Sequence, residues 1–140
     1  MDIAQDTHVF VAALRSRDGA SAEVLDRCLA SEDQAVMGAA LFSEYESLVR
    51  RESVWRDAPV SAVEREALLE DFCAAAIWQP ICFRRRPNLP DPADDHVLEL
   101  AMAGGLEQLV THNTGDFARG ELKFLSPRVV TPAQHLRIAK

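Results

Sequence analysis

Residues 94–117 read DDHVLELAMAGGLEQLVTHNTGDF, and this stretch decides the fold because it joins a helix to a strand through a very short connection. Apolar residues recur at helical spacing from Val97 to Ala101, and two glycines end the helix. Gln108 to Thr111 then reads as a short strand, followed at once by polar residues. A helix that leads directly into a strand is the repeating unit of a parallel α/β sheet.

The same alternation extends outward over the rest of the chain. Strands are predicted at residues 3–5, 34–37, 78–83 and 128–131, and helices at 8–14, 20–30, 40–51, 61–75 and 132–138. Ser61 is the predicted N-cap of its helix, with Glu64 placed for a capping box. The three prolines of RRRPNLPDPADD make residues 84–95 a loop. We therefore predict one α/β domain over residues 1–140, with a parallel sheet and helices on both faces.

Composition excludes several classes of protein. Hydrophobic residues make up 48% of the chain and charged residues 26%, which is ordinary for a globular domain. No apolar run is long enough to span a bilayer, and no signal peptide opens the chain, so a cytoplasmic location is expected. Cys28, Cys73 and Cys82 lack a CxxC pairing and are interpreted as reduced, partly buried thiols. The net charge of −7 argues against a basic protein that coats duplex nucleic acid.

Four acids, Asp6, Glu44, Asp94 and Asp116, each lie beside an apolar run. Helical spacing selects among neighbouring acids: Glu44 flanks the apolar arc of its helix, whereas Glu46 falls outside it. Asp94 precedes the buried face of its helix by one turn, whereas Asp95 points away. The acids at core boundaries are therefore the functional candidates, because acids normally avoid such places.

Asp6, Asn113 and Asp116 each follow a predicted strand. Taken singly, an aspartate that ends a strand is more commonly a turn former or a helix cap. In a parallel sheet, however, functional groups gather at the carboxyl ends of the strands. Carboxylates gathered there need a counter-charge, and Mg²⁺ or Mn²⁺ suits an oxygen-rich site. The lack of a Cys/His cluster disfavours zinc.

At these residues the chain resembles a known family. The segments DTHVFVAAL, LFSEYESLVRR, RPNLPDPADDHVLELAMAGG and LVTHNTGDF are similar to the PIN domain, in the branch that contains VapC-type toxins of bacterial toxin–antitoxin pairs. The resemblance implies a three-layer α/β/α sandwich around a parallel sheet and ribonuclease activity that depends on Mg²⁺ or Mn²⁺. It also implies an RNA substrate, a cognate antitoxin as partner and a homodimer. His8 stands where Asn is commoner in the family.

Carried over residue by residue, the resemblance makes Asp6, Glu44 and Asp94 the first three metal-binding acids. Asp116 would fill the last acidic place, with Asn113 beside it as its competitor or as a supporting residue. The resulting hypothesis is that the metal ions polarise the scissile phosphate and activate a water molecule. Thr7, Thr111 and Asn113 are candidates for fixing the carboxylates.

Other residues have weaker assignments. Arg84, Arg85 and Arg86 form a compact basic cluster, either a solvated loop or a contact for RNA phosphates. His112 and His135 are interpreted as structural or surface residues. Two alternatives remain: a non-catalytic module of the same fold that binds RNA or protein, and a different Mg²⁺ enzyme on a similar sheet, such as a phosphatase of the aspartyl-phosphate type. The phosphatase is disfavoured because it needs a second acid two residues after its nucleophile, where this chain has His8.

Overall fold

A five-stranded parallel sheet forms the centre of the computed structural model, which describes residues 1–79, 106–112, 114 and 128–139. The strands are β1 (Asp2–Gln5), β2 (Gln34–Met37), β3 (Ile77–Trp78), β4 (Gln108–Val110) and β5 (Arg128–Val130). Their order across the sheet is β3-β2-β1-β4-β5, and each paired neighbour runs parallel. The prediction of a parallel α/β sheet is confirmed, with β1 at its middle.

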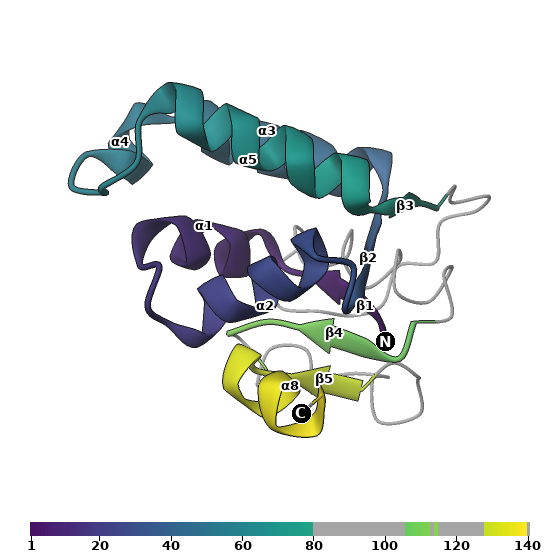
Figure 1. The fold of residues 1–140 in the computed structure, drawn as a ribbon. Coiled ribbons are helices and arrows are strands. Elements are labelled where there is room, and N and C mark those ends of the chain that lie inside the picture. The colour runs from purple at the N-terminus through teal and green to yellow at the C-terminus, as the bar shows by residue number, and fades with distance from the viewer. Residues whose placement is uncertain (80–105, 113, 115–127, 140) are drawn as a thin grey trace.

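Helices flank this sheet. They are α1 (Thr7–Arg15), α2 (Ala20–Leu29), α3 (Ala39–Arg50), α4 (Glu52–Trp55), α5 (Ala62–Ala75) and α8 (Pro132–Ala139). Figure 1 shows α3 and α5 side by side, with α1 and α2 between that pair and β4. The predicted helix boundaries agree to within a residue or two, but α4 was not predicted. The predicted loop and helix over residues 84–103 lie outside the described residues.

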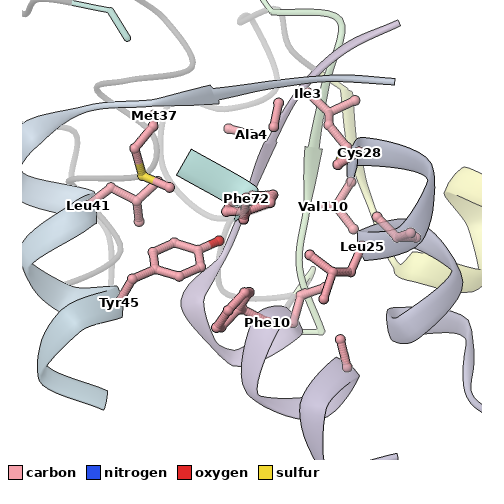
Figure 2. Packing of buried hydrophobic residues seen from close by; sticks show 14 of the residues in the cluster. Ile3, Ala4, Phe10, Leu25, Cys28, Met37, Leu41, Tyr45, Phe72 and Val110 are labelled. Carbon is pink, nitrogen blue, oxygen red and sulfur yellow. The ribbon is translucent and has the colours of Figure 1, made fainter. Parts of the chain in front are cut away.

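Aromatic side chains of three helices pack against one another beside β1. Phe10 of α1 meets Tyr45 of α3 edge-on at 5.0 Å between ring centroids, and Phe72 of α5 lies 5.7 Å from each of them. Figure 2 shows these three rings gathered beside β1. All three are almost fully buried, so each contributes a large apolar area to the core. The cluster therefore fixes α3 against the sheet.

The predicted capping box at the start of α5 is confirmed. The backbone N–H of Glu64 donates to Ser61 Oγ, and the backbone N–H of Ser61 donates to Glu64 Oε1, each at 3.2 Å. Replacing Ser61 by alanine is expected to lower the free energy of unfolding by about 1 kcal/mol, because one N–H of the first turn loses its acceptor. Urea denaturation monitored by circular dichroism measures this loss. Ser53 is an exposed serine of α4, and Ser53→Ala should have a smaller effect.

Of the two described cysteines, which were interpreted as reduced, partly buried thiols, Cys28 is buried and Cys73 is half-buried, and both are free. Burial raises the pKa of Cys28 to about 12 and that of Cys73 to about 11, so both stay protonated near neutral pH. Cys82 lies outside the described residues. Within the part of the chain that the structure describes, no helix is long and apolar enough to cross a membrane.

Candidate functional site

Asp6 directly follows β1 and is only 2% exposed. It occupies the N-cap position of α1, yet its side chain makes no capping hydrogen bond. Its two oxygens accept instead from hydroxyl groups: Oδ2 from Thr111 Oγ1 at 2.9 Å, and Oδ1 from Thr7 Oγ1 at 3.3 Å. The common role of such an aspartate as a helix cap is therefore excluded here.

The pairing of β1 with β4 brings Thr111 to Asp6. The two strands are in register at Gln5 and Val110, and the backbone N–H of Asp6 donates to the carbonyl of Val110 at 2.9 Å. Thr111 directly follows Val110 and is fully buried. Both side chains thus lie at the carboxyl edge of the sheet, where functional groups of parallel α/β proteins gather.

Asp6 is a buried carboxylate whose counter-charge is not supplied by the described side chains. Among the described residues, no basic group forms an ion pair with it, and both of the side chains that hydrogen-bond to it are neutral hydroxyls. A buried anion is costly unless a cation or several hydrogen bonds compensate it. Each hydroxyl uses one lone-pair direction of an oxygen, and no other described side chain hydrogen-bonds to these oxygens. This arrangement fits a hard, oxygen-loving divalent cation.

Helix α3 approaches the same place through Tyr45. Its phenol donates to the backbone carbonyl of Gln5 at 2.6 Å, one residue before Asp6. Burial, and then the negative charge of Asp6, raise the pKa of Tyr45 well above its ordinary value, so the phenol remains a donor. Glu44 precedes Tyr45 on α3 and is half-buried. The helix that carries the second predicted acid is therefore held against the end of β1.

Burial does not separate Glu44 from Glu46 as sharply as their helical spacing predicts. Glu46 is also half-buried, and it forms an ion pair with Arg50 at 3.5 Å, one turn further along α3. The side chain of Glu46 is 40% exposed and lines a groove between α3 and α5.

Several predicted site residues lie outside the described residues. They are Asp94, Asn113, Asp116 and the arginines Arg84, Arg85 and Arg86. Among the residues that are described, no group of three or more histidine, cysteine, aspartate or glutamate side chains could hold a metal ion. The described half of the candidate site consists of Asp6, its two threonines and α3.

A second polar cluster, which sequence reasoning missed, lies at the opposite edge of the sheet. His135 of α8 is fully buried, with Nε2 at 2.8 Å from Asp33 Oδ2 and Nδ1 against Gln108 Oε1. Arg27 Nε donates to the same oxygen of Asp33 at 2.8 Å, and the α-amino group of Met1 lies 3.7 Å from Oδ1. Asp33 and Gln108 stand at the starts of β2 and β4, so this cluster is remote from Asp6.

The structural interpretation of both histidines fits their contacts. His135 is a core residue, whereas His112 is exposed and has its Nε2 3.2 Å from Ser21 Oγ at the start of α2. His8, which stands where the family commonly has an amide, is exposed beside Thr7. Neither exposed ring forms a hydrogen bond with Asp6.

The strand order, the flanking helices and the buried acid at the carboxyl edge define a PIN-like α/β protein. The model of the PIN domain family matches residues 3–115. The chain therefore belongs to the PIN domain family, whose members are generally nucleases and typically use divalent metal ions.

One solved structure covers nearly the whole chain. It is the crystal structure of VapBC2 from Rickettsia felis bound to a DNA fragment from their promoter, with a TM-score of 0.61 and 14% sequence identity over 94% of this chain and 98% of that chain. At this level of identity the likeness establishes the fold. No match is found among curated proteins.

Proposed function

We propose that this protein is an endoribonuclease that depends on Mg²⁺ or Mn²⁺ and acts as the toxin of a type II toxin–antitoxin pair. The observation that carries the proposal is Asp6, a buried carboxylate at the carboxyl edge that two hydroxyls hold in place and no described basic group neutralises. Membership of a family of nucleases supports the class of reaction.

In this proposal Asp6, Asp94, Asp116 and Glu44 hold the cation, with Asn113 as the competitor of Asp116. When bound, the cation supplies charge for the scissile phosphate and acidifies a water molecule. Thr111 and Thr7 fix the rotamer of Asp6 through their hydroxyls. Tyr45 anchors α3, and with it Glu44, to the end of β1. Arg84, Arg85 and Arg86 contact RNA phosphates.

The proposed partners are a cognate antitoxin and a second copy of the chain. The similar solved structure is a VapBC complex, which supports an antitoxin. A groove of about 370 Å³ between α3 and α5 has an apolar floor that includes Phe42, Leu69 and the half-exposed Trp78. Glu66 and Glu70 stand on its rim, so it suits a partner segment that carries both apolar and basic residues.

Cleavage of cellular RNA tests the proposed activity. We expect the purified protein to cut total RNA at defined positions in the presence of Mg²⁺ or Mn²⁺ and to stop when EDTA is added, because the carboxylates cannot activate water alone. Mapping of the cut ends identifies the substrate. Cleavage that persists unchanged in EDTA would contradict the proposal. Tight RNA binding with no cleavage under any metal condition would favour the non-catalytic binding module instead.

A further inference from the structure

A small pocket at the far edge of the sheet carries two arginines. It has a volume of about 260 Å³ and lies between β5 and α8. Arg128 lines it from β5, and Arg137 from α8, together with Gln134 and Ile138 of the same helix. Both arginines are exposed. Two arginines from neighbouring elements therefore line one hollow.

These two arginines differ from most of the others that the structure describes. Arg17, Arg27, Arg50 and Arg65 each form an ion pair with an acidic side chain. In residues 128–139 and the other described segments, neither Arg128 nor Arg137 has such a partner. In a chain of net charge −7, acids outnumber bases, so a shortage of carboxylates does not explain why these arginines have no ion pair within the described residues.

Glu107 is the acid beside Arg128 in the pairing of β4 with β5, and its carboxylate has another contact. Arg128 donates its backbone N–H to the carbonyl of Glu107 at 3.1 Å, which places the two residues side by side. The carboxylate of Glu107, however, accepts from the backbone N–H of Asp2 at 3.4 Å. Among the described residues, therefore, no acidic side chain forms an ion pair with either arginine of the pocket.

The remaining lining indicates what kind of anion fits. Gln134 Oε1 accepts from the backbone N–H of Thr131 at 2.9 Å, which leaves its NH₂ group as a donor. Ile138 is 41% exposed and provides an apolar wall. Guanidinium groups bind phosphate through paired N–H donors, and an apolar wall beside them suits a ribose or base. Phosphate, ribose and base together make up one nucleotide of an RNA strand.

We propose that the pocket formed by Arg128, Gln134, Arg137 and Ile138 is a second RNA-binding site that holds the substrate away from the place of cleavage. This inference rests on the proposed ribonuclease function. Arg128 starts β5 and lies at the amino-terminal end of the parallel strands, whereas Asp6 follows the end of β1 and lies at their carboxyl end. They are three residues apart along the β-strands and two strand spacings apart across the sheet, so their backbones are separated by about 14 Å. A single-stranded RNA covers this distance in a few nucleotides.

The test uses the full chain and a fluorescent single-stranded RNA of mixed sequence. Binding is measured by anisotropy in EDTA at several salt concentrations, and cleavage of the same RNA is measured in Mg²⁺. The variant is Arg128→Gln with Arg137→Gln. The matched control, Arg51→Gln with Arg56→Gln, removes the same charge from two exposed arginines around α4. Circular dichroism melting confirms that both proteins are folded.

We expect the dissociation constant of the pocket variant to rise roughly five- to tenfold, and the slope of log K against log salt to fall by about 1.4, since each lost phosphate contact removes about 0.7. The control should change the slope less. In Mg²⁺ the KM of the pocket variant for RNA should be higher than that of wild type, and its kcat should be unchanged. An RNA affinity and slope equal to those of the control would overturn the inference and leave the pocket to an acidic protein partner.

The two proposals fail in different ways. If the wild-type protein binds RNA through this pocket but never cleaves it, the ribonuclease function is wrong and the binding site stands. If the wild-type protein cleaves RNA and the pocket variant binds and cleaves as the control does, the function stands and the second site is wrong.

Discussion

Replacing Asp6 by asparagine is expected to lower metal-dependent RNA cleavage by more than about a hundredfold while leaving the protein folded. Asparagine has almost the same shape, and its carbonyl oxygen still accepts from one threonine hydroxyl. It lacks the negative charge, however, and that charge is what a divalent cation needs at this position. The measurement compares initial cleavage rates of wild type and variant over a Mg²⁺ titration.

Stability supplies an independent readout for the same variant. Asp6 is 2% exposed, so its charge is costly in the metal-free protein. We therefore expect the melting temperature of Asp6→Asn in EDTA to equal or exceed that of wild type, whereas added Mg²⁺ should stabilise wild type more than the variant. Undiminished cleavage by Asp6→Asn, or equal stabilisation of the two proteins by Mg²⁺, would refute the assignment of Asp6.

Thr111 provides a control that separates charge from position. Thr111→Val keeps the shape of this buried side chain and removes the hydroxyl that donates to Asp6 Oδ2 at 2.9 Å. Cleavage should fall by about 10- to 100-fold, since the carboxylate loses the contact that orients it. Thr111→Ser restores the donor and should recover most of the activity. A valine variant with full activity would show that Thr111 is only a core residue.

The sequence predicted those parts of the structure that depend on local pattern. The alternation of short apolar runs and amphipathic helices identified β1, β2, β4 and β5, and the Ser61 and Glu64 pair identified the start of α5. A strand followed at once by a polar residue was also enough to place Asp6 at the carboxyl edge of the sheet, where functional groups of parallel strands gather. Thr111 was predicted as the last residue of its strand and as a candidate for fixing the carboxylates.

Contacts between distant residues could not be predicted in the same way. The turn α4 has only four residues and no periodicity to detect, and it is held from outside by Arg65, which donates to Glu52 at 2.7 Å. The burial of Glu46 depends on a groove that two helices form together. His135 is 102 residues from Asp33 along the chain, so nothing in either local sequence relates them.

The second large effect is expected on stability, from changes in the buried cluster around Asp33 and His135. Replacing Asp33 by asparagine is expected to lower the free energy of unfolding by about 3–5 kcal/mol, because a buried ionic contact loses one partner while the other remains. Arg27 Nε donates to Asp33 Oδ2 at 2.8 Å, and His135 Nε2 lies at the same distance from that oxygen. Asparagine cannot supply the negative charge that balances Arg27.

Two histidine variants form a matched pair for this prediction. His135→Ala removes a fully buried ring that joins α8 to the starts of β2 and β4, and should cost a similar 3–5 kcal/mol. His112→Ala removes an exposed ring that contacts Ser21 Oγ, and should cost less than about 1 kcal/mol. Urea denaturation at neutral pH measures both losses. Equal effects at the two positions would show that the buried cluster contributes nothing specific.

The pH dependence of stability follows from Asp33. Burial acts to raise the pKa of Asp33, but hydrogen bonds from Arg27 and His135 outweigh it and lower that pKa below its ordinary value. A carboxylate with a lowered pKa in the folded state stabilises the protein above its unfolded pKa of about 3.9, and this contribution is lost as the pH falls through the folded pKa. Wild type should therefore lose stability more steeply than Asp33→Asn as the pH is lowered from about 5 to 2. Because the variant has no ionisable group at this position, parallel curves would mean that the charge of Asp33 does not hold α8 in place.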